Sequence, residues 1–448
     1  MSNSFSNSSR LHKPLNKKQY KFFESIRFII DNIAKDYDKL WRKRSRKIGS
    51  KFLIHFIFNI LSNGDKGYAI ILNRIWNLYI SKDIALPQEK VFSQSSICEA
   101  RQKLCEDIFK DLNHKLIAEF EKDKANSVFM DSHRIFAIDG SKVTLPKGLE
   151  EEGYKVNNEG AHYPKGLLSC IYNLQNYIIH DFSLKDSLDE RAPALEHLEY
   201  LRENDIVIFD RGYFSYYMLH QCFNKKIHPI FRLQRGLQNE AIESFIASQQ
   251  TDIITEYTPS NTIKYDLRKK GINIDIITIK IRLIKYFIND ETYIIATTLL
   301  DQDRYKPNIF KNLYHRRWDI EELYKISKVI MNLENFHSKT QRGVKQEIYA
   351  HFILINIARF FEFYSSKNTL FNNNYKFNFK NSLETIKIYI EELLFSKIKI
   401  LLKKIPLIIY SIARVKQKKR PNRKYPRISR QPINKWKLDK KTKIIATT

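Results

Sequence analysis

The apolar residues in the first part of the chain follow a helical period. Between about residues 17 and 125 they recur three and four positions apart, which is the spacing of one face of an α-helix. Examples are Phe22, Ile26, Ile29, Ile30 and Ile33, and later Phe52, Phe56, Ile60 and Leu61. The pattern predicts an N-terminal helical domain over residues 1–128, with disorder expected before about residue 12.

After about residue 133 the apolar pattern becomes that of strands. Short β-rich runs cover residues 134–138, 167–173, 177–183 and 205–209, and a helical stretch at 190–202 precedes the last of them. Three successive strands, a crossover helix and a further strand predict a mixed α/β sheet.

A second β-rich segment is predicted from residue 228 to residue 300. An amphipathic helix is then predicted from about 309 to 333, and an apolar helix from 346 to 364. We therefore expect an α/β core formed by residues 129–227 and 301–366, with residues 228–300 as a β-rich insertion. Residues 367–448 are expected to form a C-terminal helical region and a basic tail.

Three acidic residues stand out against these elements. Asp139 and Asp210 each come directly after a short apolar run, and Glu321 lies on the amphipathic helix. Carboxylates at the mouths of buried strands are costly unless a cation compensates them, and sites in open α/β sheets gather at strand carboxyl ends. The three side chains could therefore converge on a pair of divalent metal ions, which suits phosphodiester chemistry.

One face of the predicted helix carries further polar groups beside Glu321. At about 100° per residue, Tyr314, Arg317, Glu321 and Lys328 fall within roughly a 60° arc, and Lys325 lies near the same line. Arg317 and Lys328 could hold phosphates, and Tyr314 could donate to a phosphate or stack on a base. Alternatively this face is an exposed helix stabilised by salt bridges, since Arg317 and Glu321 are an i,i+4 pair.

Composition favours a polyanionic partner. The net charge is +28, and such an excess attracts nucleic acid through counterion release. Coding bias towards lysine is the alternative source of this charge. Arg101 and Lys103, on the N-terminal helical domain, could bind DNA or simply form a solvated face. The tail at 414–443, with fourteen basic residues, could follow a phosphate backbone or be a disordered solubilising segment.

Several classes of protein are excluded or disfavoured. The four cysteines are widely spread without a C-x-x-C pair, so neither a zinc site nor a disulfide framework is indicated. No P-loop is present, and the N-terminus has no apolar segment of a signal peptide. Polar residues interrupt every apolar stretch before it reaches membrane-spanning length. We expect a protein of the bacterial cytoplasm or nucleoid.

The sequence also resembles a known family. The spacing Tyr-x2-Arg-x3-Glu-x6-Lys, which begins at Tyr314, matches the signature of the IS4-like family of DDE transposases. The run Asp210-Arg211-Gly212-Tyr213-Phe214 is similar to its second-aspartate motif, and Asp139-Gly140-Ser141 with Leu145-Pro146 resembles its first. The resemblance extends from about Ser93 to the region 423–430.

The resemblance implies a ribonuclease-H-like core with a β-rich insertion between the second aspartate and the glutamate. It further implies that Asp139, Asp210 and Glu321 hold two Mg²⁺ ions, and that Tyr314, Arg317 and Lys328 hold DNA near the cut. Mn²⁺ would suit the same oxygen ligands. Arg211 could hold a phosphate or pair with an acid.

These observations predict a transposase that cuts element ends and transfers the 3′-hydroxyl to target DNA. Its partner would be double-stranded DNA, both the terminal inverted repeats and the target, and pairing of two ends implies a homodimer on DNA. Two alternatives remain: a nuclease with the same core that performs no strand transfer, and a non-catalytic DNA-binding protein derived from a transposase.

Overall fold

The computed structural model describes residues 15–419 apart from a few short segments, which are 43–46, 65, 124–128, 131, 157–160, 235, 238, 289–290 and 369–373. The N-terminus predicted to be disordered and residues 420–443 of the basic tail lie outside the described residues. The chain forms two compact units. The helical unit combines Met1–Asn126, Val143–Lys165 and Ile326–Thr448, and the sheet unit combines Ser127–Lys142 and Gly166–Lys325.

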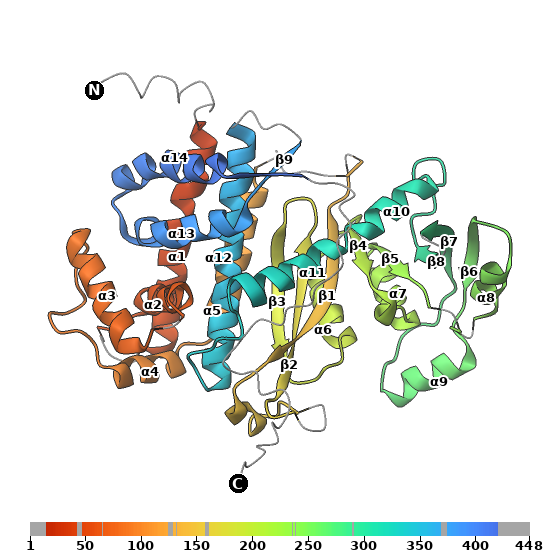
Figure 1. The fold of residues 1–448 in the computed structure, drawn as a ribbon. Coiled ribbons are helices and arrows are strands. Elements are labelled where there is room, and N and C mark those ends of the chain that lie inside the picture. The colour runs from red at the N-terminus through yellow and green to blue at the C-terminus, as the bar shows by residue number, and fades with distance from the viewer. Residues whose placement is uncertain are drawn as a thin grey trace, which may run out of the picture. The chain divides into compact units, whose positions relative to one another are not determined.

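The sheet unit is built on one mixed sheet of eight strands in the order β3-β2-β1-β4-β5-β8-β7-β6 (Figure 1). The strands are β1 (Ile135–Thr144), β2 (Lys165–Asn173), β3 (Ile178–Lys185), β4 (Ile206–Phe209), β5 (His228–Arg232), β6 (Asp252–Tyr257), β7 (Ile279–Ile288) and β8 (Glu291–Thr297). The helices of this unit are α6 (Arg191–His197), α7 (Tyr216–Asn224), α8 (Glu240–Ala247), α9 (Asn261–Lys269), α10 (Pro307–His315) and α11 (Trp318–Lys325), with the short 3-10 helices η2 (Leu198–Tyr200) and η3 (Arg211–Tyr213).

Uninterrupted apolar runs explain the centre of this sheet. All four residues of β4 and the first four of β1 are buried, as expected for parallel strands that are covered on both faces. β1 pairs in parallel with β4, and β4 with β5, whereas β2 and β3 are antiparallel. The predicted mixed α/β fold class is confirmed.

Two details of the sheet differ from the sequence prediction. β1 continues to Thr144, so Asp139 lies within a strand where burial gives way to partial exposure, and not at its end. The segment predicted as an insertion also joins the core: β5 pairs in parallel with β4, and β8 pairs antiparallel with β5. A strand's edge has unpaired backbone groups, and here the next strands satisfy them.

The predicted continuous helix over 309–333 is wrong. The chain instead forms α10, a turn at residues 316–317, α11, and a π-helical turn η4 (Ile326–Ile330) that belongs to the helical unit. Arg317 therefore lies in the break between α10 and α11. Tyr314 and Arg317 still reach neighbouring acidic residues, since Tyr314 contacts Asp210 and Arg317 contacts Asp139 and Glu321. Lys328 belongs to η4.

The helical unit contains α1 (Lys17–Trp41), α2 (Ser50–Ser62), α3 (Tyr68–Ser81), α4 (Gln94–Lys103), α5 (Asp107–Glu121), η1 (Lys147–Glu150), α12 (Gln341–Asn368), α13 (Phe379–Phe395) and α14 (Ile398–Arg414), with a small pair of strands, β9 (Tyr375–Phe377) and β10 (Lys416–Lys418). The predicted helical period holds in α1, where an Asn16 capping box starts the helix. Helix α1 packs on α12 through aromatic rings, with Phe23 and Phe361 centroids 4.3 Å apart. Among the described residues, we find no helix that combines the length and the apolar character needed to cross a membrane.

A buried ion pair ties α4 to α12 within the helical unit. Arg101 is 2% exposed, and its guanidinium donates to Glu347 Oε1 at 3.0 Å and to the Gly343 carbonyl at 3.0 Å. Burial alone would raise the pKa of Glu347, but Arg101 and His337 hold it below its usual value. This structure thus gives Arg101 a structural role, whereas Lys103 is partly exposed.

Removing Arg101 should destabilise the protein. Arg101→Met leaves the Glu347 carboxylate buried without its partner, which costs about 3–5 kcal/mol. We expect a lower melting temperature for this variant and partial recovery in the double variant Arg101→Met/Glu347→Leu. Thermal unfolding followed by circular dichroism measures both. A variant that keeps its stability but loses DNA affinity would instead favour a DNA-binding role for Arg101.

Candidate active site

Asp139 marks the point where β1 leaves the core. Its side chain is 14% exposed, and the Gly140 amide donates to its Oδ1 at 2.9 Å. The Tyr324 hydroxyl, from α11, donates to the Asp139 carbonyl at 2.7 Å. The backbone and the carboxylate of Asp139 are therefore both held by hydrogen bonds within the sheet unit.

Asp210 directly follows β4, the strand beside β1. The Tyr314 hydroxyl donates to Asp210 Oδ1 at 2.9 Å, which links α10 to this strand end. The two strands are parallel neighbours, with Ala137 opposite Ile208. Continuing this register by two residues brings Asp139 level with Asp210.

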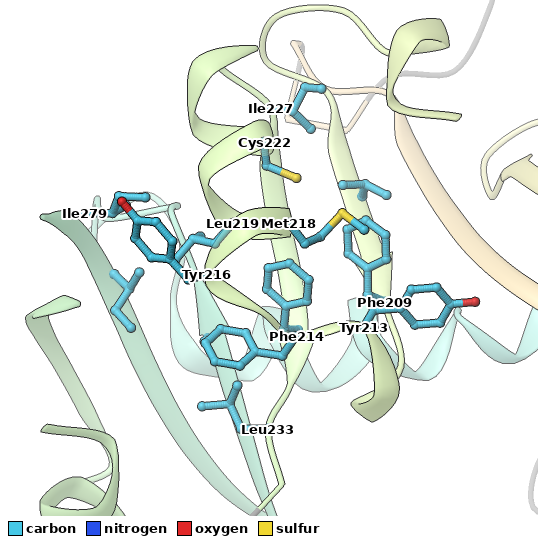
Figure 2. Close-up of a cluster of buried hydrophobic side chains, with 14 of the residues drawn as sticks. Phe209, Tyr213, Phe214, Tyr216, Met218, Leu219, Cys222, Ile227, Leu233 and Ile279 are labelled. Atoms are coloured by element: carbon cyan, nitrogen blue, oxygen red, sulfur yellow. The ribbon is translucent and has the colours of Figure 1, made fainter. Parts of the chain in front are cut away.

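Aromatic packing fixes the backbone after Asp210. Tyr213 and Phe214, in and just after η3, are buried in the apolar cluster shown in Figure 2. Phe209 stacks on Phe231 with ring centroids 4.9 Å apart. In addition, Arg191 Nε donates to the Gly212 carbonyl at 2.7 Å. The loop that carries Asp210 is thus anchored on both sides of the aspartate.

Glu321 is linked to Asp139 through Arg317. Arg317 Nη2 lies 2.6 Å from Glu321 Oε1, and Nη1 lies 3.5 Å from Asp139 Oδ2. Arg317 is only 6% exposed, whereas the Glu321 side chain is about half exposed. The guanidinium therefore spans a buried carboxylate and one that faces solvent.

The electrostatics show an excess of buried negative charge. Burial raises the pKa of Asp139 to about 7; the charges of Glu190 and Asp210 add to this effect, and Arg317 and the Gly140 amide oppose it. The pKa of Tyr314 is raised by burial and by Asp210, so the phenol remains a hydrogen-bond donor at neutral pH. The negative charges of Glu190 and Asp210 near Asp139 favour an added cation, which would replace the proton on that carboxyl group.

The other predicted site residues are distributed over both units. Arg211 is exposed next to Asp210. Lys325 is exposed on α11, with its Nζ 3.4 Å from Glu322. Lys328 belongs to η4 of the helical unit, where burial lowers its pKa, and Lys103 Nζ lies 4.0 Å from Glu99 on α4.

From the sequence, Glu190 is interpreted as a solvated or helix-capping residue, but in the structure it interacts electrostatically with Asp139 and Asp210. Glu190 immediately precedes α6, in a polar stretch that looks like an ordinary helix start. Its position beside Asp139 depends on how the chain folds back across β1, β2 and β3. No local spacing in the sequence carries that information.

The donor set fits a hard divalent cation. Asp139, Asp210 and Glu321 offer only carboxylate oxygens, which Mg²⁺ and Mn²⁺ prefer, and the raised pKa of Asp139 indicates that its charge is incompletely compensated. In the described part of the chain, no three His, Cys, Asp or Glu side chains converge closely enough to hold an ion. Here the Arg317 guanidinium supplies the positive charge between Asp139 and Glu321.

Replacing Asp139 should make the folding stability of the metal-free protein less dependent on pH. In the unfolded chain this carboxyl group titrates near 3.8 and in the folded chain at about 7. Between these values the folded state holds a proton that the unfolded state has released, so its contribution to stability falls as pH rises. Asp139→Asn removes this pH-dependent loss of stability. We therefore expect the free energy of unfolding of the variant, relative to that of the wild type, to increase from pH 4 to pH 8 by up to a few kcal/mol.

Thermal unfolding of both proteins in a chelator, at several pH values, measures this difference. The remaining titratable groups are common to both proteins, so their effects largely cancel. A difference in melting temperature that stays constant from pH 4 to pH 8 would contradict the raised pKa.

The chain is similar to known transposases. The family model described as "Transposase DDE domain" matches residues 131–357, a segment that contains Asp139, Asp210 and Glu321. No curated protein sequence matches the chain. Among solved structures, the chain is similar to that described as "Cryo-EM structure of piggyBac transposase synaptic complex with hairpin DNA (SNHP)", with 11% identity, 87% of this chain and 84% of that chain covered, and a TM-score of 0.38.

The family match covers half of the chain and includes all three acidic residues of the site. The chain therefore belongs to the family of proteins with a transposase DDE domain.

Proposed function

We propose that this protein is a DNA transposase that cuts the ends of its element and joins the freed 3′-hydroxyl to target DNA. The observation that carries the proposal is that two donors from neighbouring positions contact three carboxylates. Arg317 bridges Asp139 and Glu321, and Tyr314 holds Asp210. The family match supports DNA cleavage as the reaction class.

Asp139, Asp210 and Glu321 would hold two divalent cations, Mg²⁺ or alternatively Mn²⁺, which when bound activate the attacking hydroxyl and stabilise the leaving oxygen. Tyr314 orients Asp210 through its hydrogen bond of 2.9 Å. The aromatic cluster around η3 keeps that strand end rigid, as a site that must hold its geometry requires.

Arg317 would change partners when DNA binds. Its guanidinium is the group best suited to grip a phosphate bidentately, but in this structure it is engaged by two carboxylates. A phosphate at the site could draw the guanidinium away and leave Asp139 and Glu321 to bind cations. The exposed side chains of Arg211 and Lys325 extend the positive surface within the sheet unit.

The partner we propose is double-stranded DNA, in the form of the element's terminal inverted repeats and the target. The net charge of +28 supports this choice, because neutralising phosphates releases counterions. Lys103 and Lys328, in the helical unit, would add phosphate contacts. Pairing two ends in one complex requires two active sites, so we propose a homodimer on DNA, acting in the bacterial cytoplasm or nucleoid.

Two adjacent glutamates on α11 provide a matched test. Glu321→Gln should abolish cleavage of a labelled duplex carrying the terminal repeats that flank the gene, in buffer with Mg²⁺. Even residues that only support a metal ligand cost about 10–100-fold when replaced, so we expect a loss of more than about 100-fold. Glu322→Gln changes the neighbouring exposed carboxylate, which pairs with Lys325, and should cut at nearly the wild-type rate.

DNA binding, measured by gel shift without divalent metal, should be similar in both variants. Cleavage by Glu321→Gln at the wild-type rate would exclude the proposed triad. Joined products in the wild-type reaction would identify strand transfer, whereas cutting without joining would favour the nuclease alternative.

A further inference from the structure

Glu190 approaches Asp139 through a glycine. A Cβ atom placed on Gly140 would lie 3.1 Å from Glu190 Cγ, 3.4 Å from Glu190 Cδ and 2.8 Å from Leu167 Cδ1. The acidic side chain therefore lies against the backbone directly after Asp139. Any larger residue at position 140 would have to push Glu190 or Leu167 aside.

The start of α6 is also tied to the loop after Asp210. Arg191, next to Glu190, donates through Nε to the Gly212 carbonyl at 2.7 Å and through Nη2 to the Phe214 carbonyl at 3.5 Å. Glu190 is thus positioned from both sides, by the backbone after Asp139 and by the loop after Asp210. All of these contacts lie within the sheet unit.

Capping of α6 does not explain the half-buried position of the Glu190 side chain. Its side chain makes no hydrogen bond to the first turn of the helix. The Arg191 amide instead donates to Asp189 Oδ1 at 3.0 Å. Asp189 is exposed, whereas Glu190 is half-buried, so the partly desolvated carboxylate has a different role from that of its neighbour.

The groups around Glu190 compensate its negative charge only in part. Burial and the charges of Asp210 and Asp189 raise the pKa of Glu190, against the opposing effects of the Tyr213 hydroxyl and Lys142. Tyr213 is 1% exposed, and its hydroxyl forms no well-aligned hydrogen bond within the described structure. In Figure 2 this hydroxyl points away from the apolar cluster. A buried donor next to several carboxylates indicates a place for a polar ligand, such as a hydrated cation.

We propose that Glu190 is a fourth carboxylate of the catalytic centre and acts with Asp139 and Asp210 in binding the divalent cation. This inference rests on the proposed function, which it deepens by adding a residue to the metal-binding set. Gly140 then has a defined purpose, since the absence of a side chain allows the Glu190 carboxylate to approach.

Mn²⁺ binding to the full-length protein tests the proposal, with electron paramagnetic resonance of the free ion as the readout. Glu190→Gln keeps the shape of the side chain and removes its charge. We expect its Mn²⁺ affinity to fall by about 10–100-fold, with a similar fall in the cleavage rate. Glu190→Asp keeps the charge on a shorter side chain and should retain part of the affinity.

Glu196→Gln is the matched control, because Glu196 lies on α6, the helix that Glu190 precedes, is about half exposed and pairs with Lys185. It should bind Mn²⁺ and cut DNA as the wild type does. Melting temperatures in a chelator should be unchanged or higher for Glu190→Gln, since that variant removes one of several clustered like charges. A lower melting temperature with unchanged Mn²⁺ affinity would mean that Glu190 is only structural and would overturn the proposal.

Two failures can be told apart. Wild-type protein that binds Mn²⁺ and cuts DNA, together with Glu190→Gln that does both equally well, overturns the role of Glu190 alone. Wild-type protein that neither binds Mn²⁺ nor cuts DNA overturns the proposed function and this inference together.

Discussion

The guanidinium of Arg317 between Asp139 and Glu321 is the interaction on which the site depends. Asp139 follows four fully buried residues of β1, where an isolated carboxylate would be strongly disfavoured. A positive charge must compensate it. In this structure the compensating charge is Arg317, which the turn between α10 and α11 directs at the two acids. From this turn one arginine reaches both a strand, at Asp139, and a helix, at Glu321.

Compensation by an arginine and by a metal ion are alternatives at the same carboxylates. An arginine offers directed hydrogen-bond donors and cannot be deprotonated. It therefore compensates the charge of the carboxylates without blocking the site permanently. The surrounding scaffold must then be rigid enough to survive an exchange of cations. The stacked rings of Phe209 and Phe231 and the Arg191 bond to the Gly212 carbonyl provide that rigidity on the Asp210 side.

The sequence predicted the individual residues of the site better than the contacts between them. Asp139 and Asp210 could be found because each follows a conspicuous apolar run, and Glu321 because it lies among basic and aromatic residues. The turn at 316–317 has neither proline nor glycine, so nothing local marks the end of α10. The role of Glu190 could not be predicted, because its neighbours are set by tertiary folding. Arg101 looked like a surface cation, because one sequence cannot show that its partner Glu347 lies 246 positions away.

The interleaving of the two units along the chain has a consequence for synthesis. Helix α1 completes its aromatic packing only with Phe360 and Phe361 of α12, and the sheet unit is encoded between them. At ~5–20 residues per second, roughly 15–60 seconds separate the two segments on the ribosome. During that interval α5 can cover part of the apolar face of α1, because Phe120 packs on Phe22, but the part that Phe360 and Phe361 cover stays exposed. A nascent chain that stops within the sheet unit keeps that part of the face exposed, and so becomes a natural substrate for chaperones and proteases.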